Sequence, residues 1–230
     1  MLIRQLIDSQ SSTYSYLLAD QGQALLIDPV RDKLDDYLRL LGELQLQLIM
    51  AIDSHTHADH ITALGLLREH TGCATAFGEP NPASCASFVF HDHQKLDFGQ
   101  RSLTAWHTPG HTDDSYCFVL WPQGQEPACV FSGDTLLIRG TGRTDFQNGD
   151  AHAQWNSLQR LLTLPDATLV YPAHDYKGWT CSSIGEERRH NPRLQVADAD
   201  EYARLMAGLK LAEPKMIDIA IPANRACGRL

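Results

Sequence analysis

Four side chains of the kind that bind metal ions fall within six consecutive residues of this chain. They form the segment His55-Thr56-His57-Ala58-Asp59-His60, which follows directly after the apolar run LIMAID. Imidazole nitrogens and carboxylate oxygens are common ligands of zinc and of other first-row transition metals. Residues two apart in an extended chain can point to one side, so His55 and His57 can converge on one ion. The segment therefore predicts a metal centre at the end of a buried strand.

Three further candidate ligands each follow an apolar run, in a turn that contains Gly or Pro. They are His111 in TPGHT, Asp134 in FSGD and His174 in YPAHD. Loops at the ends of strands often carry functional side chains, because a rigid scaffold holds them in place. We therefore expect the fold to bring these three residues to the histidine segment, although they are far from it in the sequence.

The elements that must position these residues can be read from the hydrophobic pattern. Strand patterns cover residues 2–7, 13–19, 24–30, 48–53, 73–78, 94–98, 102–108, 116–121, 128–133 and 168–174. Helical patterns cover residues 32–46, 61–70, 151–162, 184–189 and 199–209. The strands and helices form two clusters, which suits two packed sheets with helices outside, a four-layer αββα arrangement. No linker-like segment interrupts the chain, so we predict one domain over residues 1–230.

The balance of charge excludes several classes of partner. Lysine and arginine total 19 against 28 acidic residues, which gives a net charge of -9. Such a surface repels phosphate backbones and anionic lipids, so we expect no nucleic acid and no membrane as partners. No apolar run approaches the roughly 18 residues of a membrane helix, and the first residues lack a secretory signal pattern. We expect a soluble cytoplasmic protein, or a mitochondrial matrix protein if a transit peptide has been removed.

The six cysteines are spread along the chain without a CxxC pair. This spacing argues against a zinc ribbon and against a thioredoxin-like redox site. Cysteines in apolar runs are usually reduced core residues. We expect this state for all but Cys227, which lies in a polar stretch, and hence for Cys73, Cys85, Cys117, Cys129 and Cys181.

The ligand motifs resemble those of a known superfamily. HTHADH, PGHT, SGD and PAHD, with the strand end IDP, occur in the order of the metal motifs of the metallo-β-lactamase superfamily. The resemblance covers residues 28–174 and implies the αββα fold, with two mixed sheets and the metal in the cleft between them. SGDTLLIRGTGRTDFQNGD, PAHDYKG and IPANRACG further resemble the persulfide dioxygenase branch, which oxidises glutathione persulfide to sulfite and glutathione.

The resemblance implies one ferrous ion per chain, held by His55, His111 and Asp134. Two histidines and one carboxylate leave three coordination positions open, for the persulfide sulfur and for dioxygen. The same ligands accept zinc, which is the alternative metal. Asp28 is expected to be a structural carboxylate at a strand end. The remaining ligand-type residues are expected to orient these groups or to form a second metal site: His57, Asp59, His60 and His174.

An acidic protein that binds an anionic tripeptide needs cations near its site. Arg139 and Arg143 lie on the loop that follows Asp134 and are placed to bind carboxylates. Tyr176, Arg225 and Cys227 are further candidate substrate residues. The expected partners are glutathione persulfide and dioxygen, and a homodimer is compatible with the sequence.

Two other functions remain open on the same scaffold. Glyoxalase II, a metal-dependent hydrolase of a glutathione thioester, shares HxHxDH but normally lacks the TDFQ run that follows Arg143 here. It also usually has a longer helical C-terminal region. A di-iron redox or oxygen sensor would usually be joined to a flavin domain, and we find no flavin segment. Metal content and oxygen uptake with glutathione persulfide separate the three functions.

Overall fold

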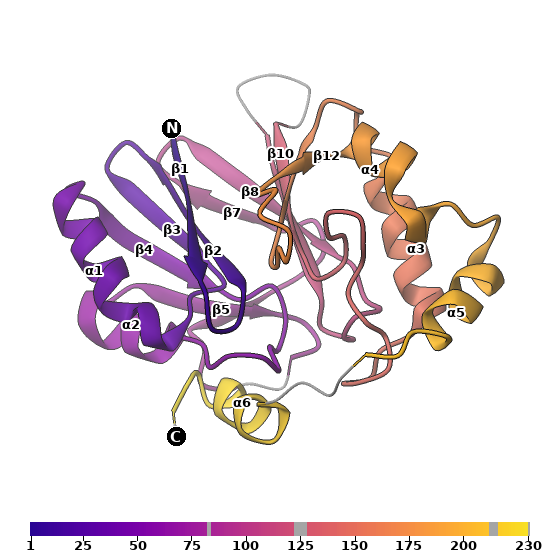
Figure 1. The fold of residues 1–230 in the computed structure, drawn as a ribbon. Helices are drawn as coiled ribbons and strands as arrows, with labels where there is room; N and C mark the ends of the chain where they lie inside the picture. Colours follow the sequence, from indigo (N-terminus) through magenta and orange to yellow (C-terminus); the bar gives the residue numbers. More distant parts are fainter. Residues whose placement is uncertain (82–83, 122–127, 212–215, 230) are drawn as a thin grey trace. The chain divides into compact units, whose positions relative to one another are not determined.

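The computed structural model describes residues 1–81, 84–121, 128–211 and 216–229. The chain divides into two compact units, which are described separately below (Figure 1). The first unit comprises Met1–Phe90, Leu96–Ser102 and Glu213–Leu230. The second unit comprises His91–Lys95 and Leu103–Ala212.

The first unit is built on a mixed sheet with the strand order β1-β2-β3-β4-β5-β6. Its strands are β1 (Leu2–Asp8), β2 (Thr13–Asp20), β3 (Gln23–Ile27), β4 (Gln47–Ile52), β5 (Ala74–Gly78) and β6 (Phe88–Phe90). The pairs from β1 to β3 are antiparallel and those from β3 to β6 are parallel. The parallel strands β3 and β4 therefore end at the same edge of the sheet, which is where the histidine segment begins.

Two helices lie on the same side of this sheet, α1 (Leu34–Glu43) and α2 (Leu64–Thr71), with the short helix η1 (Arg31–Lys33) before α1 (Figure 1). Residues two apart on a strand share a face, and Leu17 and Ala19 of β2 both pack into the core beneath these helices. The helices contribute Leu41 and Leu64 to the same buried cluster. The apolar face of each helix, which repeats every 3.6 residues, thus packs against the face that alternate residues of the strands form.

The second sheet is also mixed and has the order β12-β11-β10-β9-β8-β7. Its strands are β7 (Lys95–Phe98), β8 (Arg101–His107), β9 (Tyr116–Leu120), β10 (Cys129–Gly133), β11 (Leu169–Pro172) and β12 (Ser182–Ser183). The helices of the second unit are α3 (Ala151–Leu161), α4 (Ile184–His190), η2 (Pro192–Leu194) and α5 (Ala199–Ala207). In its core, Leu158 of α3 and Tyr202 of α5 pack with Val130 of β10. Asp150 begins α3 by accepting the backbone N–H groups of His152 and Ala153.

The predicted α/β class with two mixed sheets is confirmed, and each predicted strand and helix is present with shifted ends. Helix α2 begins three residues later than predicted, because Thr62 pairs with Val30 in an isolated bridge. The pattern missed β6, β12 and α6 (Ile217–Arg225). Helix α6 contains Pro222, which disfavours a helix interior. No side chain caps its first turn, so the pattern that usually marks the start of a helix is missing. Within the described part of the chain, no helix has the length and apolar character needed to cross a bilayer.

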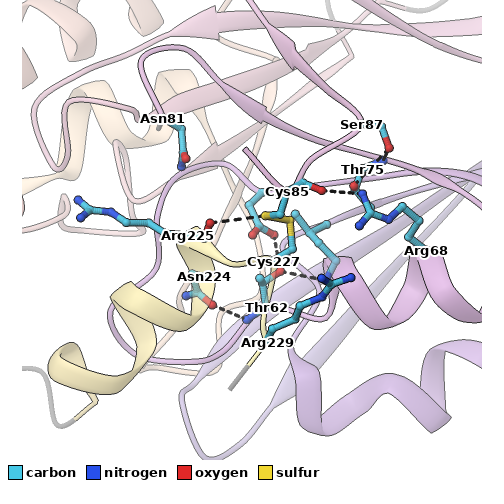
Figure 2. The surroundings of a disulfide bond; sticks show 12 residues. Thr62, Arg68, Thr75, Asn81, Cys85, Ser87, Asn224, Arg225, Cys227 and Arg229 are labelled. Carbon is cyan, nitrogen blue, oxygen red and sulfur yellow. Dashed lines mark hydrogen bonds between the residues drawn. A yellow bond between two sulfur atoms is a disulfide. The ribbon is translucent and has the colours of Figure 1, made fainter. Parts of the chain in front are cut away.

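The cysteines depart from the prediction at two positions. Cys85 forms a disulfide with Cys227, so the prediction that Cys85 is reduced is wrong (Figure 2). The partners are separated by 142 residues, and local spacing cannot reveal such a pair. Cys181 is exposed and is not a core residue. The other three are buried free thiols as predicted, namely Cys73, Cys117 and Cys129.

Candidate metal centre

A buried carboxylate joins the ends of β3 and β4 in the first unit. Asp28 follows β3, is 2% exposed, and accepts hydrogen bonds from the Ser54 backbone N–H (2.6 Å) and hydroxyl (2.9 Å). Its backbone N–H donates to the Ile52 carbonyl at the end of β4 (2.9 Å). Its Oδ1 also lies 3.1 Å from His57 Nε2, so Asp28 fixes the orientation of that imidazole ring.

Asp28 has the properties of a structural carboxylate. Its backbone is in the left-handed region, at a φ of 51°, which Asp adopts more readily than most residues. Burial raises the pKa of the Asp28 carboxyl, while His55 and the hydrogen bonds from Ser54 act in the opposite direction. These contacts hold the first part of the histidine segment to the sheet.

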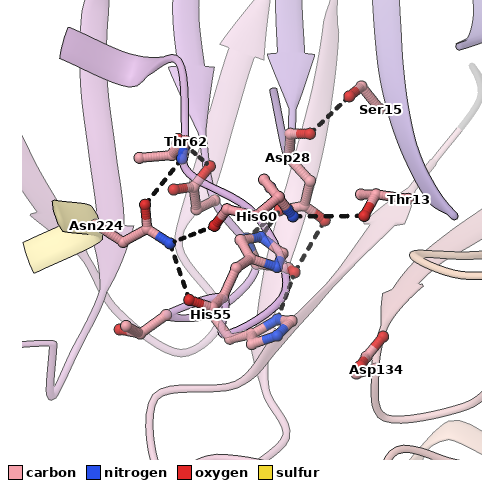
Figure 3. A network of polar contacts seen from close by, with 12 residues as sticks. Thr13, Ser15, Asp28, His55, His60, Thr62, Asp134 and Asn224 are labelled. Carbon is pink, nitrogen blue, oxygen red and sulfur yellow. Dashed lines mark hydrogen bonds and ion pairs between the residues drawn. The ribbon is translucent and has the colours of Figure 1, made fainter. Parts of the chain in front are cut away.

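The remaining part of the histidine segment is held by polar contacts that include the first residue of β2. Asp59 Oδ2 lies 3.0 Å from His60 Nδ1 and accepts the hydroxyl of Thr13 at 2.9 Å. The same hydroxyl lies 3.4 Å from His60 Nδ1 (Figure 3). The ring of His60 is buried, and its Nε2 has no hydrogen-bond partner among the described residues. Ligand atoms of His57, Asp59 and His60 lie within 4.8 Å of one another. His55 is buried as well, with Nδ1 3.0 Å from the Ser54 hydroxyl.

The second unit gathers three of the predicted ligands around one carboxylate. Asp134 follows β10, and its two oxygens lie 3.4 Å from His111 Nε2 and 3.6 Å from His174 Nε2. His111 Nδ1 lies 2.8 Å from the Arg143 carbonyl, which can only accept, so the Nδ1 proton is directed there. His111 Nε2 therefore presents its lone pair towards Asp134, which is the arrangement of metal ligands.

Gly142 allows these ligands to approach one another. Its N–H donates to the Asp134 carbonyl (2.7 Å), and a Cβ at this position would lie 2.2 Å from that oxygen. The same Cβ would lie 2.9 Å from the His111 ring. Any side chain at residue 142 would therefore displace both ligands.

A metal cofactor fits both groups of donors. Neutral imidazoles with one nitrogen fixed by an oxygen acceptor, next to carboxylates, are typical of transition-metal sites. The structure brings together the predicted residues His57, Asp59 and His60 in the first unit. It brings together His111, Asp134 and His174 in the second unit.

A pocket of about 600 Å³ opens beside the ligands of the second unit. The predicted substrate residue Tyr176 lines this pocket and is 73% exposed. Its ring is nearly parallel to that of His174, with 5.8 Å between the centroids. Besides these residues the lining includes His111, Asp134, Lys177 and Arg193.

The two arginines predicted to bind substrate already have carboxylate partners. Arg139 forms ion pairs with Glu186 and with the fully buried Glu187. Its hydrogen bond holds the pKa of the Glu186 carboxyl below the ordinary value. Arg143 donates to both oxygens of Asp145 (2.6 and 2.8 Å), so these contacts favour structural roles for both guanidinium groups.

The two candidates near the end of the chain, Cys227 and Arg225, both belong to the first unit. Cys227 is 1% exposed and is bonded to Cys85, so it offers no free thiol to a substrate. Arg225 is exposed on α6 in the first unit.

Sequence reasoning missed Arg193, which lines the pocket of the second unit. Its guanidinium donates to the Thr141 carbonyl (2.5 Å) and hydroxyl (3.1 Å) and forms no ion pair with a carboxylate of the described residues. Burial lowers the pKa of this arginine, because it removes water from the charged group. No motif surrounds Arg193, and it lies far along the chain from the ligands, so the sequence carried no signal for it.

A family model described as the metallo-beta-lactamase superfamily matches residues 9–81 and 86–174, and the chain belongs to this superfamily. Mitochondrial persulfide dioxygenase ETHE1 of Homo sapiens is 42% identical over 232 residues, which cover 99% of this chain and 89% of that protein. The corresponding Bos taurus protein has the same identity and coverage.

Solved structures give a consistent result. The crystal structure of ETHE1 from Myxococcus xanthus is 50% identical, has a TM-score of 0.95 and covers 100% of both chains. A protein solved in a di-iron-bound form is 27% identical with a TM-score of 0.70, over 82% of this chain and 98% of that one. The predicted superfamily, fold and persulfide dioxygenase branch are confirmed by these relatives.

Replacing Arg139 by Ala is expected to destabilise the protein by about 3 kcal/mol, because it leaves the buried Glu187 carboxylate without its cation. Urea denaturation followed by circular dichroism measures this change. The matched control is Arg188→Ala, which removes an exposed ion pair with Asp166 and should cost about 1 kcal/mol or less. Unchanged stability together with a raised KM would instead assign Arg139 to the substrate.

Proposed function

We propose that this chain is an iron-dependent persulfide dioxygenase acting on glutathione persulfide. The reaction is RSSH + O₂ + H₂O → RSH + SO₃²⁻ + 2 H⁺, in which the terminal sulfur is oxidised and dioxygen is reduced. The observation that carries the proposal is the similarity to persulfide dioxygenases over nearly the whole chain. The histidine and carboxylate donors of the two units supply the ligand types that such an iron site requires.

The proposed ligands of a single Fe(II) are His55, His111 and Asp134, which form a set of two histidines and one carboxylate. Such a set leaves open positions for both reactants. When bound, ferrous iron supplies the one-electron chemistry that the reaction with dioxygen requires. The other donors then orient the ligands through hydrogen bonds, namely His57, Asp59, His60 and His174.

The chain itself fixes the protonation of its ligands. The Arg143 carbonyl holds the proton of His111 on Nδ1, so Nε2 is the nitrogen left to bind metal. In the first unit, Asp28 restrains His57 and Asp59 contacts His60. These contacts restrain the three imidazole rings in the absence of metal, as preorganisation of a site requires.

The direct test is oxygen consumption by protein loaded anaerobically with Fe(II). We expect one iron per chain, rapid oxygen uptake with glutathione persulfide, and one sulfite formed per dioxygen consumed. Zinc-loaded protein is the control and should consume no oxygen. Thioester hydrolysis without oxygen uptake would establish the hydrolase instead, and absence of both activities would favour a sensor.

One observation favours a second candidate, a two-metal hydrolase of glutathione thioesters. The Asp134 carboxylate lies between His111 and His174, as a bridging carboxylate would. His57, Asp59 and His60 form a further group of donors in the first unit, and one similar protein was solved with two irons. The number of metals bound by variants distinguishes the two candidates.

Asp134→Ala is expected to abolish both iron binding and oxygen uptake, because Asp134 is the anionic ligand. His174→Ala should keep most of its iron, because His174 lies outside the proposed ligand set. His152→Ala, which removes an exposed histidine paired with Asp200, is the control and should match the unmodified protein. Metal analysis by mass spectrometry gives the stoichiometry. Complete loss of iron from His174→Ala would replace the single-ion site by a dinuclear one.

The proposed substrate carries carboxylates, and the second unit offers cations to bind them. Arg193 and Lys177 both line the pocket beside His111 and Asp134. Because no described carboxylate pairs with Arg193, its charge can meet an incoming anion. A bidentate guanidinium–carboxylate contact is among the stronger hydrogen-bonded pairs. Arg139 and Arg143 line the same pocket but are paired with carboxylates, so we assign the substrate carboxylates to Arg193.

Arg193→Ala is expected to raise the KM for glutathione persulfide by about ten- to a hundredfold, the loss of one charge-assisted hydrogen bond. Iron content should stay unchanged. Arg189→Ala, which removes an exposed cation paired with Asp166, serves as the control. An alkyl persulfide without carboxylates should show no difference between Arg193→Ala and the unmodified protein. An equal KM increase for both persulfides would mean that Arg193 supports the pocket and does not bind the substrate.

The proposed location is the cytoplasm, or the mitochondrial matrix if the chain is a processed eukaryotic form. Two of the similar proteins are described as mitochondrial. The proposed partners are the two substrates alone, without nucleic acid or membrane, and a homodimer is compatible with this function.

A further inference from the structure

One buried amide from the C-terminal helix holds the backbone of the histidine segment. Asn224 of α6 is 1% exposed, and its Nδ2 donates to the carbonyls of His57 and His60, both at 2.9 Å. Its Oδ1 accepts the Thr62 backbone N–H at 2.8 Å (Figure 3). The side chain therefore uses both of its donors and its acceptor on the segment that carries the candidate ligands.

The segment depends on this amide because it belongs to no strand or helix between residues 53 and 61. Buried backbone groups outside regular structure need partners from elsewhere, and leaving one unpaired is costly. Asn224 supplies three such partners from a position 164 residues beyond His60. The backbone positions of His57 and His60 are thus set from α6.

Covalent and close backbone contacts fix the end of α6 in the first unit. The Cys227 N–H donates to the Asn224 carbonyl, and the Cys227 carbonyl accepts the Gly65 N–H, both at 2.9 Å. A Cβ on Gly65 would lie 2.6 Å from that carbonyl, so α2 meets the C-terminal segment without room for a side chain. The Cys85–Cys227 disulfide closes this arrangement three residues after Asn224 (Figure 2).

We propose that Asn224 is a positioning residue for the histidine segment and that the Cys85–Cys227 disulfide controls how firmly it holds that segment. The proposal rests on the proposed function only in taking this segment to carry metal ligands. The C-terminal segment would thereby couple the metal centre to the thiol–disulfide balance around the protein.

The redox step is ordinary thiol–disulfide exchange with a low-molecular-weight thiol. Cys85 is partly exposed and Cys227 is buried, so the incoming thiolate attacks the Cys85 sulfur and Cys227 leaves and takes up a proton. A second thiol then releases Cys85 as a thiol. The reductant forms one disulfide and the protein gains two electrons and two protons. Reduction frees the residues after Asn224 from the loop beyond β5.

Hydrogen exchange measured by mass spectrometry on the full-length protein tests the positioning role of Asn224 without using enzyme activity. In Asn224→Asp, a carboxylate oxygen replaces the donor and faces the two carbonyls. Amides of residues 55–62 should then exchange about tenfold faster, the factor expected from losing one or two hydrogen bonds. Helix α3 in the second unit should exchange at its original rate. Loss of protection throughout both units would show general destabilisation and would overturn the positioning role.

The proposed control by the Cys85–Cys227 disulfide is tested by measuring hydrogen exchange before and after treatment with dithiothreitol. Thiol titration of the unfolded oxidised protein should give four free thiols, and all six after reduction. Reduced protein and Cys227→Ser should both exchange faster at residues 55–62, whereas Cys181→Ser, which lacks only an exposed free thiol, should match the oxidised protein. Equal hydrogen exchange in both redox states, or six free thiols before reduction, would overturn the proposed control by the disulfide.

Enzyme kinetics add an independent readout on iron-loaded protein. A positioning role predicts that Asn224→Asp lowers kcat and speeds iron release with little change in KM, because the pocket lining does not include Asn224. Unchanged kcat and iron release would contradict it. The exchange results do not depend on which reaction the enzyme catalyses. Absence of oxygen uptake would therefore refute the proposed function without refuting the positioning role of Asn224.

Discussion

The first unit depends on the buried carboxylate of Asp28, which is hydrogen-bonded to Ser54 and contacts His57. Asp28 is buried at the end of β3, where it joins that strand to β4 and restrains His57. An isolated charge in such a place is strongly unfavourable, and the surrounding hydrogen bonds offset this penalty only while the local geometry is kept. The parallel pairing of β3 and β4 supplies that geometry, because it places both strand ends at one edge of the sheet. The sheet register and the ligand positions are therefore parts of the same constraint.

In the second unit, backbone groups hold the candidate ligands in place. The carbonyl of Arg143 fixes the His111 ring, and the N–H of Gly142 binds the carbonyl of Asp134. Arg143 thus serves the ligands through its main chain, while its guanidinium pairs with Asp145. The buried Arg139–Glu187 pair connects the loop after Asp134 to α4. These contacts keep the loop after Asp134 in place, and Arg193 lines the pocket beside it.

The sequence was most informative where chemistry and strand ends coincide. The candidate ligands stood out because each follows an apolar strand and because their order matches that of a known superfamily. The ion pairs of Arg139 could not be predicted, because its partners Glu186 and Glu187 come 47 and 48 residues later and local charge reasoning cannot see them. Asn224 and the pairing of Cys227 with Cys85 escaped notice for the same reason, since the partners lie far back in the chain. Contacts of this kind are set by the tertiary fold, and single-sequence patterns report mainly on local structure.

The contact between Asn224 and the histidine segment also imposes an order on biosynthesis. A ribosome makes the chain from its N-terminus, and His60 is made 164 residues before Asn224. During that interval the strands around the segment can pair, but the carbonyls of His57 and His60 lack the amide that binds them in the finished protein. A nascent chain therefore holds the histidine segment without three of its buried hydrogen bonds. The segment acquires these bonds only after Asn224 has been made and helix α6 has formed.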